Sequence, residues 1–320
     1  MSIPLIIDTD TAQDDCIAIL VGLLDERSDL IAITTVAGNV GFERQIENAL
    51  MTLNVAGRLG GTPIYPGSQR PMVRPWVSAE KVHGDGAGGL SMDFDGCAIE
   101  SEHGVDALVR LAAERPGEIT LVATGPLTNI ATATIRDPSF SRNVKRLVVM
   151  GGSNNGRGNI TAAAEFNIYV DPEAAKIVFD AGFDVTVVPW APLTLRDAVF
   201  GRDRLAEIER LATPLSAFFL RVCRATLDFD ERVGIPGTTH PDSLAVSIAL
   251  RPDLVTSAAA YHIDVETASP LTRGYTAMSW GVHGLAPNAT VIEQVDGARF
   301  YRLILGLLAT VTTPQRPFSS

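Results

Sequence analysis

The sequence predicts an α/β fold: a doubly wound, mainly parallel sheet with helices on both faces, in a single domain spanning residues 1–320. Two observations lead to this prediction. Short apolar segments with the length of buried strands alternate with longer segments whose apolar residues recur at helical spacing. No low-complexity linker, fixed-period repeat or charge block interrupts this alternation, so a second domain is not expected.

Four carboxylates lie where the first predicted strand ends and the first predicted helix begins. Residues 3–7 (IPLII) have the length and branching of a buried strand, and apolar residues recur at helical spacing from Asp14 onward. Asp8, Asp10, Asp14 and Asp15 therefore lie at the end of a strand and on the first turn of a helix. In an open α/β sheet, ligands bind at this edge.

The later elements follow from the same alternation, which is typical of a parallel sheet. We expect strands at residues 30–36, 119–123, 146–150, 185–188, 258–265, 274–278 and 290–292. We expect helices at residues 42–59, 127–135, 172–181, 205–211, 215–227, 243–250 and 300–308.

Two loops are longer than simple connections require, and long ordered loops are usually functional or mobile. Residues 65–104 contain the glycine-rich run VHGDGAGG. Residues 151–169 carry Asn159, Glu165 and Asn167, whose polar groups can hold a sugar by hydrogen bonds.

The composition limits the classes of function. A hydrophobic content of 46% in 320 residues allows a sizeable core and argues against wholesale disorder. The net charge of -11 argues against nucleic acid or an anionic membrane as the main partner. Three cysteines without paired spacing predict no disulfide framework, and no signal-peptide pattern or membrane-length apolar run is present. We therefore expect a cytoplasmic protein.

The four N-terminal carboxylates predict a metal site. Helix capping accounts for one or two acids, but four within eight residues would repel one another in a poorly solvated place. A bound cation relieves that repulsion, and oxygen ligands without cysteine or histidine favour Ca²⁺ or Mg²⁺. Asp10 and Asp15 are the expected ligands, with Asp8 and Asp14 orienting water or substrate; structural capping is the alternative.

Five motifs, most of them directly after expected strands, would meet at one sheet edge. They are DTDTAQDD (8–15), TTVAGNV (34–40), ATGPLTNIA (123–131), VVMGG with GNITAAAEFN (148–152 and 158–167), and THPDSLAV (239–246). The set resembles the inosine–uridine-preferring nucleoside hydrolase family, of which the DTDxxxDD opening is the most specific motif. The resemblance runs through nearly the whole chain.

The resemblance implies a site residue by residue. It implies that Ca²⁺ is bound by Asp10, Asp15, the backbone carbonyl of Thr124 and Asp242, and that Asp10 is also the general base for the attacking water. The residues that match ribose-binding positions are Asp14, Asn39, Asn159, Glu165, Asn167 and Asp242, with Met150 beneath the sugar ring and His83 in a loop beside the pocket.

The implied reaction is calcium-dependent hydrolysis of the N-glycosidic bond of a ribonucleoside to ribose and free base, through an oxocarbenium-like transition state. Carboxylates and amide oxygens around the sugar would stabilise that positive charge. The family also implies a homo-oligomer, a dimer or tetramer.

The sequence departs from the family at the leaving base. Pro241 stands where a histidine usually precedes the metal-binding aspartate, and His240 lies one position earlier. Adjacent residues in extended backbone point to opposite sides, so His240 is expected to face away from the base. It is either a structural histidine in a surface or packed loop, or a functional group of the site. Aromatic stacking on the base could replace the histidine; the candidates, each expected in the core rather than in the pocket, are Trp190, Phe229, Tyr275 and Trp280.

Two other functions compete with this one. A haloacid dehalogenase-like phosphatase also opens with a strand and DxD, but Ala12 lacks the Thr or Val of that motif, and the Asp14–Asp15 pair is left unexplained. A nucleoside-binding protein without turnover is the second alternative, suggested by Pro241.

Overall fold

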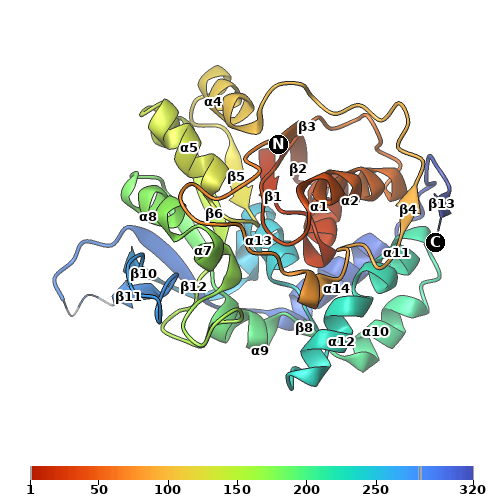
Figure 1. Cartoon of the computed structure of the whole chain (residues 1–320). Helices are drawn as coiled ribbons and strands as arrows, with labels where there is room; N and C mark the ends of the chain where they lie inside the picture. Colours follow the sequence, from red (N-terminus) through yellow and green to blue (C-terminus); the bar gives the residue numbers. More distant parts are fainter. Residues whose placement is uncertain (1, 280, 282, 320) are drawn as a thin grey trace.

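The computed structural model describes residues 2–279, 281 and 283–319 and is built around one large sheet (Figure 1). The strands of this sheet are β1 (Ile3–Thr9), β2 (Ser28–Thr35), β3 (Ile64–Pro66), β5 (Thr120–Ala123), β6 (Arg146–Met150), β7 (Val185–Val188), β10 (Val255–Val265), β11 (Thr276–Ser279) and β12 (Ala289–Val295). Their order is β11-β10-β12-β7-β6-β5-β1-β2-β3. The strands from β3 to β12 pair in parallel, and β10 and β11 add an antiparallel edge.

The direction of sheet growth reverses at β1. The chain adds β2 and β3 on one side of β1, and β5, β6 and β7 on the other. Asp8 of β1 lies opposite Thr34 of β2 and Ala123 of β5, so these strands end at the same level. A crevice between oppositely directed connections forms at such a point, beyond the carboxyl ends of the strands.

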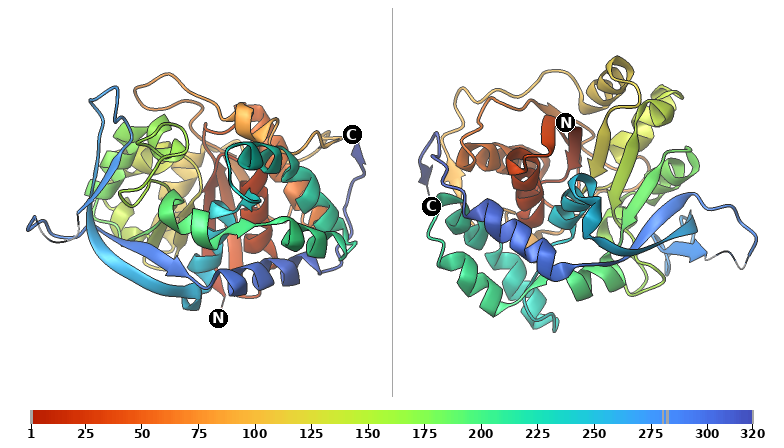
Figure 2. Two further views of the ribbon diagram at one scale, coloured as in Figure 1. Left: turned by 90° about the horizontal axis from the view of Figure 1, so that it is seen from below. Right: turned by 180° about the vertical axis from the view of Figure 1, so that it is seen from behind.

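Helices cover both faces of the sheet, as Figures 1 and 2 show. One apolar core joins the sheet to α1 (Gln13–Leu24), α2 (Phe42–Val55), α11 (Pro214–Val222), α13 (Pro241–Leu250) and α14 (Gly297–Leu308). A second core lies under α4 (Gly104–Glu114), α5 (Thr128–Arg136) and α8 (Pro172–Asp180). Every residue of α13 is buried, and its sequence is mainly apolar on all sides, as expected of a buried helix.

Smaller elements complete the structure. The remaining helices are α3 (Glu80–His83), α6 (Phe140–Asn143), α7 (Phe166–Val170), α9 (Leu195–Asp197), α10 (Arg202–Glu209) and α12 (Arg224–Arg232), with a π-helical turn at Trp190–Thr194 and a 3₁₀ turn at Pro252–Leu254. Two short strand pairs join β4 (Ser91–Met92) to β13 (Phe318–Ser319) and β8 (Val199–Phe200) to β9 (Thr238–Thr239). Among the described residues, no helix is long and apolar enough to cross a membrane.

The predicted fold class is confirmed, and the expected strands at residues 146–150 and 185–188 match β6 and β7. The structure differs from the predicted elements in several places. The helix expected at 42–59 ends at Val55, just before Gly57 takes a positive φ of 68°. The helix expected at 215–227 is two helices, α11 and α12, which meet at Cys223. Strand β3 and helices α3 and α4 lie where loop or nothing was expected.

Candidate functional site

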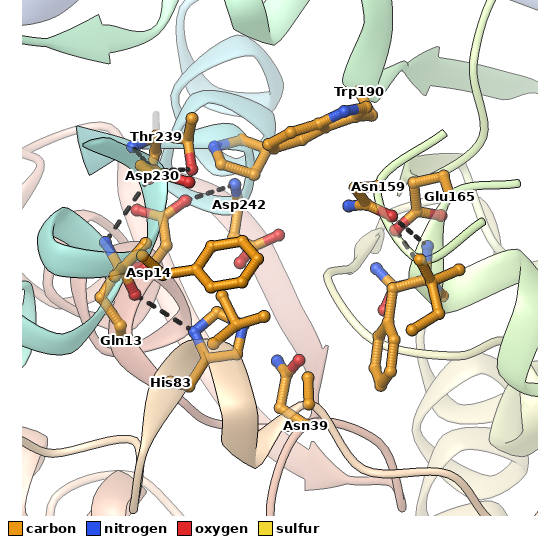
Figure 3. A pocket seen from close by; sticks show the side chains of 18 of the residues that line it. Gln13, Asp14, Asn39, His83, Asn159, Glu165, Trp190, Asp230, Thr239 and Asp242 are labelled. Atoms are coloured by element: carbon orange, nitrogen blue, oxygen red, sulfur yellow. Dashed lines mark hydrogen bonds between the residues drawn. The ribbon is translucent and has the colours of Figure 1, made fainter. Parts of the chain in front are cut away.

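A pocket with a volume of about 330 Å³ lies beyond the carboxyl ends of the central strands (Figure 3). Its walls come from the start of α1, the loop after β2, α3, the loop after β6, α12 and the start of α13. The predicted site residues that line it are Asp14, Asn39, His83, Thr124, Met150, Asn159, Glu165, Asn167 and Asp242. The topology therefore brings together residues from five separate motifs.

Asp10 and Asp15 do not line the pocket but are buried within the protein. Oδ2 of Asp10 accepts a hydrogen bond from the backbone N–H of Asn39 at 2.9 Å. Its Oδ1 is buried and has no hydrogen-bond partner among the described residues. Gly38 makes this position possible, because a Cβ there would lie 2.0 Å from Asp10 Oδ2.

Asp15 is held by donors on both of its oxygens. Oδ1 accepts from the hydroxyls of Thr9 at 2.7 Å and Thr124 at 2.8 Å. Oδ2 accepts from the backbone N–H of Ala12 at 3.0 Å and the amide of Asn39 at 3.3 Å. The strand ends on either side of the switch point thus fix the orientation of this carboxylate.

The buried carboxylates raise one another's pKa. Desolvation, followed by repulsion from Asp15, holds the pKa of Asp10 and of Asp242 well above the usual range. Burial raises the pKa of Asp15 to about 6, against hydrogen bonds that lower it. Burial likewise raises the pKa of Glu165 to about 7. None of these four carboxylates forms an ion pair with a Lys or Arg in the described part of the chain.

This charge deficit fits a bound cation. Hard carboxylate oxygens, one of them without a partner, surround a place that lacks positive charge. In residues 2–279, 281 and 283–319, no three side chains of His, Cys, Asp or Glu are arranged to hold a metal ion by themselves. Backbone carbonyl, water or substrate oxygens would have to complete such a site. The carbonyl of Thr124 accepts one hydrogen bond, from Asn167 at 2.8 Å, and keeps a second lone pair.

Asp14 joins two helices. Its Oδ2 accepts from the backbone N–H groups of Asp242 at 2.6 Å and Ser243 at 3.2 Å, which are the free donors of the first turn of α13. Its Oδ1 lies 2.9 Å from both the Ser243 hydroxyl and Nδ1 of His240. The carboxylate that was expected to bind ribose therefore also positions Asp242.

The loop after β6 forms the opposite wall of the pocket. Glu165 caps α7 by accepting from the backbone N–H groups of Asn167 at 2.8 Å and Ile168 at 3.2 Å. The amide of Asn167 donates to the carbonyls of Thr124 and Met150, and Oδ1 of Asn159 accepts from a backbone N–H at 2.8 Å. Backbone N–H and carbonyl groups of this loop and of Thr124 therefore fix the polar side chains that are predicted to hold the sugar.

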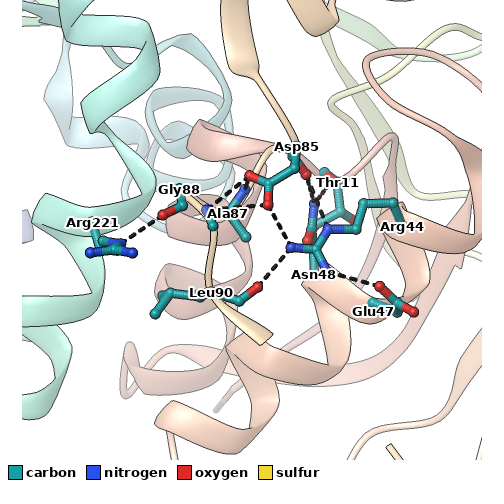
Figure 4. A network of polar contacts seen from close by, with 10 residues as sticks. Thr11, Arg44, Glu47, Asn48, Asp85, Ala87, Gly88, Leu90 and Arg221 are labelled. Carbon is teal, nitrogen blue, oxygen red and sulfur yellow. Dashed lines mark hydrogen bonds and ion pairs between the residues drawn. The ribbon is translucent and has the colours of Figure 1, made fainter. Parts of the chain in front are cut away.

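His83 stands at the end of α3, on a loop that a polar network ties to α2 (Figure 4). Asn48 donates to the carbonyls of Thr11 at 3.0 Å and Asp85 at 3.1 Å, and Arg44 forms an ion pair with Asp85 at 2.7 Å. Nδ1 of His83 lies 3.3 Å from the hydroxyl of Thr226, and burial lowers the pKa of His83 to about 4. The imidazole is therefore neutral near pH 7.

The structure separates His240 from the pocket. Its ring is fully buried between Phe200, with centroids 4.3 Å apart, and Phe219, at 5.3 Å. Pro241 lines the pocket in its place, at the first turn of α13. His240 is thus a packed histidine that supports Asp14.

The candidates for aromatic stacking have different positions. Phe229 is half-buried and lines the pocket, so the expectation that it belongs to the core was wrong. Trp190 both lines the pocket and packs in the core. Tyr275 lies outside the pocket, where its hydroxyl donates to Asn155 at 3.0 Å. Trp280 is outside the described residues.

Sequence reasoning missed several lining residues, chiefly Gln13, Thr226 and Asp230. The expected helix ended at residue 227, so Asp230 was not recognised as part of an element beside the site. The spacing of Thr226, Phe229 and Asp230 by three and four residues, which places them on one face of a helix, was the signal that could have revealed it.

Comparison with known proteins agrees with this geometry. A family model described as inosine-uridine preferring nucleoside hydrolase matches residues 5–302. The chain belongs to this family. The chain is also similar to a pyrimidine-specific ribonucleoside hydrolase RihA from Citrobacter koseri, with 34% identity over 313 residues that cover 97% of this chain and 99% of that protein.

Solved nucleoside hydrolases have the same fold. A plant nucleoside hydrolase, PpNRh1, superposes with a TM-score of 0.86 at 29% identity, over 97% of this chain and 100% of that one. A purine-preferring ribonucleoside hydrolase from Gardnerella vaginalis gives 0.88 at 28% identity, over 96% and 98%. The protein is therefore a nucleoside hydrolase and not a haloacid dehalogenase-like phosphatase. The named relatives differ in the base that they prefer.

Proposed function

We propose that this hydrolase cleaves the N-glycosidic bond of ribonucleosides in a calcium-dependent reaction that releases ribose and the free base. The observation that carries the proposal is the set of buried carboxylates at the switch point, which has no Lys or Arg partner among the described residues. A bound Ca²⁺ would supply the missing charge and act as a Lewis acid toward water and sugar hydroxyls. Its protein ligands would be Asp10, Asp15, Asp242 and the Thr124 carbonyl.

The residues of this chain then have separate tasks. Oδ1 of Asp10, which has no partner among the described residues, accepts the proton of the attacking water. Surrounding carboxylates stabilise the positive charge that develops on the sugar as the bond breaks. The groups that hold the ribose hydroxyls are Asp14, Asn39, Asn159, Glu165, Asn167 and Asp242, with Met150 beneath the ring and His83 beside it.

The size of the pocket favours a nucleoside over a larger ligand as the substrate. Its volume of about 330 Å³ suits a small molecule. The net charge of -11 disfavours nucleic acid. The proposal includes a homo-oligomer that acts in nucleoside catabolism and salvage in the cytoplasm, as the family resemblance implies.

Ribose release from a panel of purine and pyrimidine ribonucleosides, measured by a reducing-sugar assay, tests this function. We expect release that a chelator abolishes and that added Ca²⁺ restores, and poor release from 2′-deoxyribonucleosides, which lack a hydroxyl for the metal and for Asp14. Chelator-resistant release would contradict the role of the metal.

A second candidate, a nucleoside-binding protein with weak or no turnover, is favoured by one observation: Pro241 lines the pocket where a proton donor is expected. Calcium-dependent nucleoside binding measured by calorimetry, without any base release, would support this candidate.

A further inference from the structure

Helix α12 forms the wall of the pocket opposite the loop that carries Asn159 and Glu165 (Figure 3). Thr226, Phe229 and Asp230 of this helix line the pocket, followed by Val233 and Ile235. The surface is mainly apolar and includes an aromatic ring, which suits a planar base. Pro241, beside this wall, has no proton to donate.

Asp230 is the buried acid of this wall. Its side chain is 2% exposed, and Oδ2 accepts hydrogen bonds from the backbone N–H of Thr239 at 3.1 Å and its hydroxyl at 3.0 Å. Within the described part of the chain, Oδ1 accepts no hydrogen bond. A proton on this carboxyl group would therefore sit on Oδ1, the oxygen that Thr239 leaves free.

We propose that Asp230 is the catalytic residue that protonates the departing base, in place of the histidine that Pro241 replaces. This inference rests on the proposed hydrolysis. The C1′–N bond breaks with its electron pair passing to the base, which takes the proton from Asp230. The oxygen of water bonds to C1′, and its extra proton passes to Asp10. Exchange with solvent then returns both carboxyl groups to their starting states, so water is the only co-reactant.

The protonation behaviour of the neighbouring groups is consistent with this role. Burial raises the pKa of Asp230 to about 6, although Thr239 and the nearby His240 lower it. A general acid is most effective when its pKa lies near the working pH. His83 on α3 is neutral near pH 7 because burial lowers its pKa to about 4.

Of the other charged side chains on α12 and on the elements packed against it, only Lys81 lines the pocket in the described part of the chain. The remaining charged side chains on the elements packed against it are Glu80 and Lys81 on α3 and Arg221 on α11, and those on α12 itself are Arg224, Asp228, Glu231 and Arg232. Lys81 and Arg157 line the pocket but are exposed.

Substrates that differ in the leaving group test the proposal. Ribonucleosides need a proton on the departing base, whereas p-nitrophenyl β-D-ribofuranoside releases a phenolate that is stable without one. We expect Asp230→Asn to lower kcat on ribonucleosides by roughly 100-fold or more while leaving the nitrophenyl substrate nearly unaffected. We also expect wild-type kcat to decline above about pH 6, as Asp230 loses its proton, and this decline to be absent in the variant.

The controls separate this role from folding and from the proposed function. Asparagine at position 230 retains an acceptor for the hydrogen bonds from Thr239. If Asp230→Asn does not fold, Asp230→Ser serves as the second variant and should show the same selectivity between the two substrates. Asp228→Asn removes an exposed carboxylate on the same helix and should behave as wild type. Equal losses on both substrates, a change in KM alone, or no change would overturn the role of Asp230. A wild-type protein inactive on both substrates would overturn the hydrolysis itself.

Discussion

At the scale of single residues, the site depends on how tightly Asp10 is enclosed. The side chain is fully buried, one oxygen is fixed by Asn39, and the other has no partner among the described residues. Such a group is costly to bury without a function, because one hydrogen bond compensates only part of its desolvation. The free-energy cost of burying Asp10 is consistent with the proposed roles of this residue as a metal ligand and as the general base.

Replacing this carboxylate tests both roles. We expect Asp10→Asn, which is nearly isosteric, to lower kcat by roughly 10²–10⁴-fold, because the base is lost. Circular dichroism and thermal unfolding should show an intact fold. Turnover at the wild-type rate would mean that another group takes the proton from water.

Gly38 offers a test of position without a change of charge. A methyl group there would lie 2.0 Å from Asp10 Oδ2, so the carboxylate must move. A displacement of about 1 Å at a reacting group can cost about 100-fold in rate, and we expect Gly38→Ala to lower kcat to that extent. Gly41→Ala is the matched control, since a Cβ there meets no atom within 4 Å. Equal rates in the two variants would show that Asp10 adapts.

At the scale of elements, α1 and α13 share an apolar core, and the carboxylate of Asp14 adds a polar link between them. Asp14 accepts hydrogen bonds from two backbone N–H groups and one hydroxyl at the start of α13 and contacts His240. The negative charge also interacts favourably with the positive end of that helix dipole. The same contact sets the position of Asp242, so stability and the site are coupled here.

Removing this contact should destabilise the protein. We expect Asp14→Ala to lower the free energy of unfolding by on the order of 3 kcal/mol, because several buried donors lose their acceptor. Urea unfolding measures the loss. Ser243→Ala removes one donor and should cost about 1 kcal/mol, whereas the exposed Asp203→Ala should be nearly neutral. A small effect of Asp14→Ala would show that water replaces the carboxylate.

At the scale of the whole molecule, the doubly wound topology collects acids that lie far apart in the sequence. Asp10 and Asp15 follow β1, Glu165 follows β6, and Asp242 begins α13. Burial raises the pKa of all four acids, and repulsion from neighbouring carboxylates raises the pKa of Asp10, Asp15 and Asp242 further, so the arrangement opposes ionisation unless a cation is bound.

This arrangement predicts how stability depends on pH. The pKa is raised to about 6 for Asp15 and about 7 for Glu165, whereas unfolded carboxyls titrate near pH 4. The folded state then binds more protons between about pH 4 and 7, and stability falls as pH rises through that window. We expect the Tm of the metal-free protein to be lower at pH 8 than at pH 5.

Calcium should reverse this trend, because it binds the ionised carboxylates. The rise in Tm on adding Ca²⁺ should therefore be larger at pH 8 than at pH 5. Glu165→Gln cannot ionise and should weaken the pH dependence of the metal-free protein. A Tm that is insensitive to Ca²⁺ at both pH values would contradict the metal site.

The sequence by itself determined the fold class and most strand positions, and it predicted many of the residues that line the pocket. Local apolar periodicity and the motifs that follow strands carry this information, as the matches of β6 and β7 illustrate. Nearly all residues expected around the sugar line one pocket because parallel strands bring their carboxyl ends to the same edge.

Only the tertiary structure decided where individual side chains point. In the folded protein, His240 is buried between Phe200 and Phe219, and Asp14 caps α13. Asp230 lies on the pocket wall. These positions depend on contacts between residues more than 200 positions apart or on the break between α11 and α12, which periodicity does not encode. Which groups are buried, paired or free is a property of packing, and it is this property that sets their chemistry.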